Sequence, residues 1–191
     1  MRVIAFTGLP GAGKTVAADV AREMGLPVAR MGDCVWDEVR ARELPLTEEN
    51  VARVAREMRE RHGPAIWAKL TLGRVAHRGY DLLVVDGVRS PDEVDHLRAT
   101  LRRDFLLVAV VADEATRWRR IQERKRHDET ADHALFAARD AREKAFGIER
   151  AMAAANVTIH NDGGLEPLRA SIRAILETAA GGKWPSGGAP P

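Results

Sequence analysis

The chain has 191 residues, of which 45% are hydrophobic and 30% are charged, and this length and balance indicate one globular domain. Its 30 Lys and Arg residues nearly balance 28 Asp and Glu residues, so the net charge of +2 gives little reason to expect nucleic-acid binding. The one cysteine, Cys34, excludes an internal disulfide and a cysteine-based zinc cluster, and no apolar run approaches the ~18 residues of a membrane span. We therefore expect a cytoplasmic protein with no membrane partner and no signal peptide ahead of its first strand.

The chain begins with a predicted strand, a glycine-rich loop and a helix. An apolar run occupies residues 2–7, and helix-forming residues follow over 13–24. Between them, the spacing Gly-x-x-x-x-Gly-Lys-Thr is that of a phosphate-binding loop. Glycines let such a loop turn its N–H groups toward anionic oxygens, and the following helix adds the positive end of its dipole. The residues expected to bind a nucleoside triphosphate are Gly8, Leu9, Pro10, Gly11, Ala12, Gly13, Lys14 and Thr15.

The last two residues of this loop indicate ATP and Mg²⁺ as cofactors. Lys14 can reach the β- and γ-phosphates of a bound triphosphate, and the Thr15 hydroxyl can be a ligand of Mg²⁺. The alternative, a glycine-rich turn without a ligand, fits less well because the loop stands between a strand and a helix.

A short strand is predicted next, over residues 28–31, and it ends at Gly32-Asp33. A carboxylate in this position would face the γ-phosphate, where it can take a proton from an acceptor hydroxyl or organise the waters of Mg²⁺. The alternative role for Asp33 is to cap the helix that starts at Cys34.

A group of helices is predicted between the second and third strands, over residues 34–42, 47–61 and 65–77. We expect this region, about 34–78, to bind the acceptor of the phosphoryl group. Its Trp36 and Trp67 can either stack on an acceptor base or pack in the core.

The third predicted strand covers residues 82–86 and ends on Asp86. A carboxylate in this position is typical of a Walker B residue, which holds Mg²⁺ directly or through water, although it can also cap the next turn. Arg89 follows closely enough to face the same cleft and bind an acceptor phosphate, and a solvated turn arginine is the alternative. A helix over 91–100 comes next.

A fourth strand over residues 105–112 leads into a basic helix over 115–126 and a charged helix over 132–146. Basic residues after this strand can form a lid, about 117–146, that closes over the triphosphate, excludes water and neutralises developing charge. The alternative is a solvated basic face. The lid residues expected to act are Arg120 and Arg124.

The last predicted elements are a helix over 148–155, a strand over 156–160 and a helix over 165–179, followed by a flexible tail over 181–191. Five strands alternating with helices predict a three-layer α/β/α domain, residues 1–180, with a five-stranded parallel sheet. Ligands of such sheets bind beyond the carboxyl ends of the strands. We therefore expect the phosphate-binding loop and the polar residues that end the strands to lie along one rim.

Together these residues resemble the P-loop kinases of small metabolites, especially an archaeal-type group related to dephospho-CoA kinase and adenylate kinase. The resemblance covers the chain to about residue 178 and implies the P-loop kinase fold with a basic helical lid. Similarity to adenylate kinases lies in Gly32-Asp33 and Asp86-Gly87-Val88-Arg89. Similarity to dephospho-CoA kinases lies in Asp33, Thr116-x-x-x-Arg120-x-x-x-Arg124, Arg139-Asp140-x-x-Glu143 and Asn161-Asp162-Gly163.

The resemblance also implies an activity and further binding residues. In dephospho-CoA kinases the lid arginines contact ATP phosphates or stack on adenine, and the Asn-x-Gly loop supports the base, so Asn161 and Gly163 are expected to bind ATP. The implied reaction transfers the γ-phosphoryl group of ATP to a small, nucleotide-like acceptor. Two alternatives stay open: phosphorylation of a hydroxyl group, as in dephospho-CoA kinases, and an ATP-binding regulator or slow ATPase. The sequence indicates neither the identity of the acceptor nor the oligomeric state.

Overall fold

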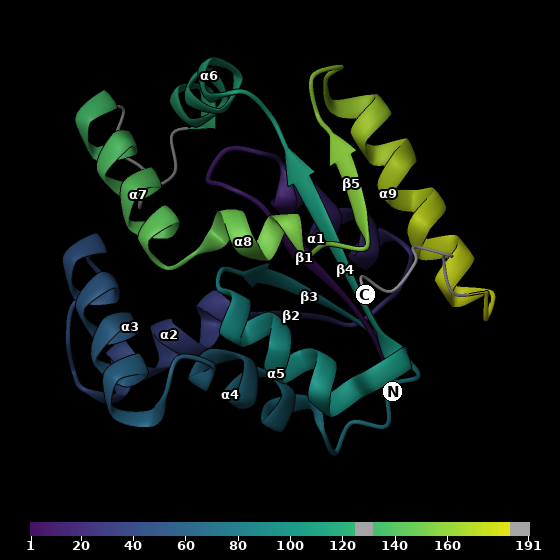
Figure 1. Cartoon of the computed structure of the whole chain (residues 1–191), viewed down its shortest axis with the longest axis horizontal. Helices are drawn as coiled ribbons and strands as arrows, with labels where there is room; N and C mark the ends of the chain where they lie inside the picture. Colours follow the sequence, from purple (N-terminus) through teal and green to yellow (C-terminus); the bar gives the residue numbers. More distant parts are fainter. Residues whose placement is uncertain (125–131, 184–191) are drawn as a thin grey trace.

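Five parallel strands form the sheet of this computed structural model, which describes residues 1–124 and 132–183 (Figure 1). Their order across the sheet is β2-β3-β1-β4-β5, so the first strand lies at the centre and pairs with β3 and β4. The strands are apolar almost throughout, as expected for a parallel sheet with both faces covered. Their bounds are Arg2–Thr7 (β1), Val28–Arg30 (β2), Leu82–Val88 (β3), Phe105–Val111 (β4) and Val157–His160 (β5).

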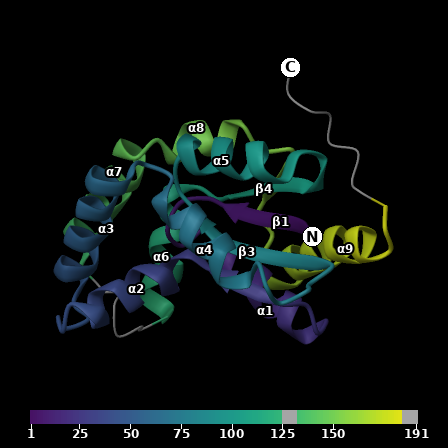
Figure 2. The same cartoon turned by 90° about the horizontal axis from the view of Figure 1, so that it is seen from below.

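Helices cover both faces of the sheet, which confirms the predicted three-layer α/β/α architecture. Ile4 and Phe6 of β1 pack against α1 and α9, whereas Val3 and Ala5 face the core shared with α2 to α5 and α8. Figure 2 shows α5 and α8 on one side of the strands and α1 and α9 on the other. The helices are Lys14–Glu23 (α1), Met31–Ala41 (α2), Glu48–His62 (α3), Ile66–Val75 (α4), Pro91–Leu101 (α5), Glu114–Arg124 (α6), His133–Ala145 (α7), Ile148–Ala153 (α8) and Leu165–Ala180 (α9).

The second strand is shorter, and the following helix begins earlier, than the sequence predicted. β2 lies at the edge of the sheet and pairs only with β3, through Val28 to Arg30. α2 begins directly at Met31. Asp33 therefore lies in the first turn of α2, where a carboxylate is stabilised by the positive end of the helix.

The third strand continues beyond Asp86 to Val88, which the sequence did not predict. The register between β1 and β3 shifts after Phe6, and Gly87 takes up this irregularity with a φ of 99°. The Thr7 hydroxyl donates to the carbonyl oxygen of Val88 at 2.9 Å. Asp86 therefore stays inside the sheet, and the turn that carries the next residues starts later than predicted.

Candidate active site

The phosphate-binding loop lies directly on two later segments of the chain. A Cβ atom on Gly11 would come within 2.6 Å of the carbonyl oxygen of Arg117 in α6. A Cβ atom on Gly13 would come within 2.6 Å of Asn161 Nδ2, which follows β5. Both glycines also have positive φ angles, 79° and 114°, which side chains rarely tolerate. Only glycine lets the loop approach α6 and Asn161 this closely.

Arg117 fastens this loop to helix α7. Its Nη1 donates to the carbonyl oxygen of Pro10 at 3.1 Å and to Asp140 Oδ1 at 2.8 Å, and its Nη2 donates to Asp140 Oδ2 at 2.6 Å. Both side chains are buried, and the guanidinium group lies 5.2 Å from the ring centre of Phe136. A pair that uses both carboxylate oxygens is among the strongest hydrogen-bonded arrangements in proteins. The base of the predicted lid is therefore tied to the loop in this structure.

Arg120 and Asn161, two predicted site residues, are joined beside the loop. Arg120 Nη2 donates to the carbonyl oxygen of Asn161 at 2.9 Å and to its Oδ1 at 3.2 Å. Asn161 Nδ2 donates in turn to the carbonyl oxygen of Ala12 at 2.8 Å, so Asn161 holds the loop itself. Gly163 lies in the turn between β5 and α9, whereas the side chain of Arg124 lies outside the described part of the structure.

Lys14 is the first residue of α1, and its ammonium group lies among charged residues. Its Nζ donates to the carbonyl oxygens of Gly8 and Leu9, the latter at 2.9 Å. Burial lowers the pKa of Lys14 from 10.5 to about 8, and the negative charges of Glu143 and Asp86 oppose that shift. The lysine is therefore held by its own loop, and it can exchange these carbonyl oxygens for the oxygens of a phosphate.

Arg30 joins the two carboxylates that were predicted to serve Mg²⁺ or proton transfer. Its Nε lies 3.8 Å from Asp86 Oδ2, and its Nη1 lies 3.8 Å from Asp33 Oδ1. Arg30 and Asp86 are register partners across β2 and β3, so their side chains leave the same face of the sheet. The guanidinium group also lies 5.4 Å from the ring centre of Trp36. Sequence reasoning missed Arg30, because an arginine at a strand end belongs to no motif and only the register shows its partner.

Arg89 meets helix α7 through Glu143. Arg89 Nη1 lies 3.2 Å from Glu143 Oε1, and Arg139 Nε lies 3.8 Å from the same oxygen. Burial by itself would raise the pKa of Glu143, but the positive charges of Arg89, Lys14 and Arg139 outweigh it, and the pKa lies below its usual value. The Glu143 charge in turn raises the pKa of Arg89. The sequence analysis named Glu143 only as the last residue of Arg139-Asp140-x-x-Glu143 and gave it no role. Its spacing of three residues from Asp140 was the available signal, because residues three apart lie on one side of a helix.

The turn that carries Arg89 is held in place by Glu93. One oxygen of this buried carboxylate accepts the N–H groups of Arg89 at 2.7 Å and Ser90 at 3.2 Å, while Ser90 Oγ accepts the N–H of Glu93. Arg59 of α3 donates to the other oxygen at 3.0 Å and lies 4.6 Å from the ring centre of Phe146. The backbone of Arg89 is therefore linked to the helices between β2 and β3.

The predicted site residues lie mainly at the carboxyl ends of the strands. Lys14, Asp86 and Arg89 are close enough for their charges to act on one another, and Asp33 is connected to Asp86 through the arginine at the end of β2. Trp67, by contrast, packs in the core and donates its Nε1 to a backbone carbonyl of α3.

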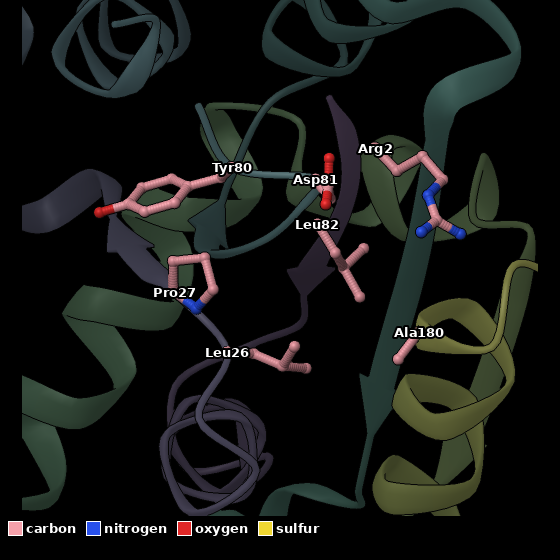
Figure 3. A pocket seen from close by; sticks show the side chains of 7 residues that line it. All are labelled: Arg2, Leu26, Pro27, Tyr80, Asp81, Leu82 and Ala180. Atoms are coloured by element: carbon pink, nitrogen blue, oxygen red, sulfur yellow. The ribbon is translucent and has the colours of Figure 1, made fainter. Parts of the chain in front are cut away.

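A hollow of about 280 Å³ lies at the other end of the sheet, where strands β1 and β3 begin (Figure 3). It is separate from the loop and contains none of the predicted site residues. Within residues 1–124 and 132–183, no three His, Cys, Asp or Glu side chains are grouped as a metal site, and no helix has the length and apolar character that a membrane crossing requires. The residues around the hollow are Arg2, Leu26, Pro27, Tyr80, Asp81, Leu82 and Ala180.

The sheet order and the loop after β1 together define a P-loop protein with the kinase fold. Among solved structures, TT1252 from Thermus thermophilus has a TM-score of 0.61 at 21% identity, and the match covers 92% of this chain and 96% of TT1252. A gluconokinase from Sinorhizobium meliloti 1021 has a TM-score of 0.57 at 19% identity, with coverages of 95% and 94%. A shikimate kinase from Bacteroides thetaiotaomicron has a TM-score of 0.55 at 18% identity, with coverages of 94% and 98%. These similarities concern the fold, and they confirm the predicted P-loop kinase fold.

Residues 7–134 match the family described as AAA domain, and the chain belongs to the UPF0200 family of archaeal proteins. It is 42% identical over 180 residues to the UPF0200 protein of Methanothrix thermoacetophila, and the alignment covers 93% of this chain and 97% of that protein. The UPF0200 protein of Methanosarcina mazei is 36% identical over 176 residues, with coverages of 92% and 94%. The UPF0200/UPF0201 protein of Archaeoglobus fulgidus is 40% identical over 178 residues, and this chain spans 55% of its length. The predicted relation to an archaeal-type P-loop family is confirmed.

Proposed function

We propose that this protein is a kinase that transfers the γ-phosphoryl group of ATP to a small, nucleotide-like acceptor. The observation that supports this most directly is the group formed by Lys14, Asp86 and Arg89, which lie at the carboxyl ends of the paired strands β1 and β3. The three residues come from the loop, from β3 and from the turn after β3. Such a group can stabilise a transferring phosphoryl group and place an acceptor beside it.

In this proposal the loop binds ATP, and Thr15 and Asp86 would hold Mg²⁺. Magnesium sites in such proteins use one or two protein ligands and complete the shell with phosphate oxygens and water. Two features support this assignment: Thr15 follows Lys14 in the first turn of α1, and Asp86 is close enough to Lys14 for its charge to act on the lysine. When bound, the ion would neutralise part of the charge on the phosphates.

The remaining residues divide between the two substrates. On the ATP side, Lys14 leaves its loop carbonyls to donate to the phosphates, while Asn161, braced by Arg120, keeps the loop in shape. On the acceptor side, Arg89 binds an anionic group of the acceptor, and Asp33 orients water or accepts a proton. Arg124 and Gly163 remain predicted contributors to ATP binding.

Phosphorylation of a hydroxyl group is the second candidate, and Asp33 favours it. Its side chain is 46% exposed, so an acceptor arriving from solvent can reach it. A carboxylate within hydrogen-bonding reach of an acceptor hydroxyl can serve as its general base. Two of the proteins that share this fold are named as a gluconokinase and a shikimate kinase.

An ATP-consumption assay with AMP, CMP, UMP, dTMP and dephospho-CoA tests both candidates. A kinase is expected to consume ATP rapidly only when one of these acceptors is present, whereas a slow ATPase or regulator shows no such dependence. Lys14→Ala is expected to lower kcat/KM by about 100-fold or more, because it removes a cation from the transferring group.

The same assay separates the two candidates through Asp33. With a hydroxyl acceptor, Asp33→Asn is expected to lower kcat about 100-fold or more, as for loss of a general base. With a monophosphate acceptor the change is expected mainly in KM. Asp37→Asn is the matched control, because Asp37 lies one turn further along α2 and pairs with Arg74 at 2.6 Å. Failure of all five acceptors to accelerate ATP consumption would contradict the proposal and support the regulator.

A further inference from the structure

Glu143 occupies a place where the anionic group of a ligand is expected. Its carboxylate extends from α7 to Arg89, 3.2 Å away, and to Arg139, 3.8 Å away. Lys14 of the phosphate-binding loop is also close enough for its charge to act on this carboxylate. Two arginines therefore lie beside one buried carboxylate, and the charge of the loop lysine also acts on it.

The geometry of this cluster is that of a contact that can be exchanged. The distances from Glu143 Oε1, 3.2 Å to Arg89 and 3.8 Å to Arg139, are longer than the about 2.7–2.9 Å of a strong arginine–carboxylate hydrogen bond. The side chains of Arg89 and Arg139 are 39% and 26% exposed, so a ligand can reach them from solvent. A phosphate or carboxylate group of a ligand offers the same kind of acceptor oxygens as Glu143. Because it is not attached to α7, it can adopt the orientation in which its oxygens meet the guanidinium groups best.

We infer that Arg89 and Arg139 form an anion site for a phosphate or carboxylate group of the acceptor, and that Glu143 occupies this site in the ligand-free protein. The acceptor binds by displacing Glu143 from the two guanidinium groups. Glu143 is therefore an internal competitor and not a catalytic residue.

The internal competitor has a consequence for specificity. A neutral molecule gains too little from the arginines to displace a carboxylate, whereas a doubly charged phosphate interacts with them more strongly than Glu143 does. The site therefore selects acidic acceptors. The assignment to the acceptor rests on the proposed function, whereas the exchange of one anion for another can be measured by binding alone.

Calorimetric titration of the full chain with inorganic phosphate tests the exchange. Saturating Mg²⁺ and ADP are present, so that phosphate does not compete for the loop. Glu143→Gln keeps the shape of the side chain but removes its charge. The variant is expected to bind phosphate about tenfold more tightly than the wild type does. This is the difference expected if Glu143 leaves the site free in about a tenth of the wild-type molecules.

Two further variants show whether the gain belongs to this site. Glu48→Gln is the matched control, because Glu48 of α3 pairs with Arg142, which belongs to α7 as Glu143 does. It is expected to leave the phosphate affinity unchanged. Adding Arg89→Gln to Glu143→Gln is expected to abolish the gain. If Glu143→Gln does not fold, Glu143→Asp withdraws the carboxylate by one methylene and is expected to show a smaller gain.

Each contrary outcome has a definite meaning. Equal phosphate affinity in the wild type and in the folded Glu143 variant would overturn the inference, and so would a gain that survives Arg89→Gln. A gain seen in ATP titrations but not in phosphate titrations would assign the arginines to the triphosphate and overturn the acceptor site. A gain for phosphate in a protein that phosphorylates no acceptor would support the anion site while contradicting the proposed kinase activity.

Discussion

Two arginine–carboxylate pairs involve residues of α7 that lie one turn apart, yet they differ in geometry and in exposure. Asp140 binds Arg117 through both oxygens, at 2.8 and 2.6 Å, and Arg117 is 3% exposed. Glu143 Oε1 lies 3.2 Å from Arg89 Nη1, and the Arg89 side chain is 39% exposed. The first pair contacts the phosphate-binding loop through Pro10, and the second lies near Lys14.

The two pairs differ in role: Arg117 with Asp140 supports the structure, whereas Arg89 with Glu143 is a contact that a ligand can replace. Two charges buried together are costly to separate, because each would remain without water or partner. A pair with one partner open to solvent contributes little to stability and can be replaced by a ligand. The same helix therefore fixes the loop on one side and leaves the proposed acceptor site adjustable on the other.

The largest expected effect on stability follows the loss of Asp140, the buried carboxylate that pairs with Arg117. Asp140→Ala leaves Arg117 buried without its partner, and we expect the free energy of unfolding to fall by about 3–5 kcal/mol. Urea unfolding monitored by circular dichroism measures it. Glu149→Ala, which removes a carboxylate that is 64% exposed, is the control and should change stability by less than about 0.5 kcal/mol. A loss below about 1 kcal/mol for Asp140→Ala would show that the pair does not support the fold.

A double-mutant cycle measures each pair directly. For Arg117→Ala with Asp140→Ala we expect a coupling of about 2–3 kcal/mol, because the two groups are desolvated and share two hydrogen bonds. For Arg89→Ala with Glu143→Ala we expect about 0.5–1 kcal/mol, because Arg89 is partly solvated. Unfolding free energies of the single and double variants provide both values. Equal couplings would remove the distinction between the pairs.

The pH dependence of ATP affinity tests the connection between Glu143 and Lys14. Since the pKa of Lys14 is about 8, ATP binding is expected to weaken as the pH rises above about 8, where the lysine loses its charge. The dissociation constant should then rise by about tenfold per pH unit. Glu143→Gln removes a negative charge that raises the pKa of Lys14, so the weakening should begin at a lower pH.

Calorimetric titrations with ATP from about pH 6 to about pH 10, on both sides of the pKa of Lys14, measure this profile. Lys14→Arg, which stays charged throughout, is expected to remove the dependence on pH. Glu48→Gln should leave the wild-type profile unchanged. An identical onset in the wild type and in Glu143→Gln would show that Glu143 has no electrostatic influence on Lys14.

Among the single substitutions in the two pairs, the smallest expected change in stability is that of Glu143, the partner of Arg89. Glu143→Ala should lower the free energy of unfolding by about 1 kcal/mol, because the arginines left behind remain partly solvated. Thermal unfolding, with and without inorganic phosphate, measures the change. Phosphate should stabilise Glu143→Ala more than it stabilises the wild type. A loss as large as that of Asp140→Ala would show that Glu143 is a structural support and not an exchangeable group.

Much of the fold could be predicted from the sequence, because apolar periodicity and turn residues act over short distances. The first helix was expected over 13–24 and spans Lys14–Glu23, and the last was expected over 165–179 and spans Leu165–Ala180. The misses lie where pairing decides the boundary. β2 ends at Arg30 because α2 begins at the next residue, and β3 extends to Val88, where its register with β1 shifts.

The candidate site could be predicted only in part. Asp86 and Arg89 were found because the carboxyl ends of parallel strands meet at one rim. The partners of these residues were not found. Arg30 reaches Asp86 only because β2 and β3 pair in a particular register, and Glu143 reaches Arg89 only because α7 packs beside the turn after β3.

The sequence alone determined the phosphate-binding loop, because the loop needs consecutive residues of fixed type and its glycines and lysine are neighbours in the chain. The tertiary structure alone decided which charges are paired around it. Ion pairs act through space between distant segments, so Arg117 with Asp140 and Arg89 with Glu143 are defined by how α6, α7 and the turn after β3 pack together.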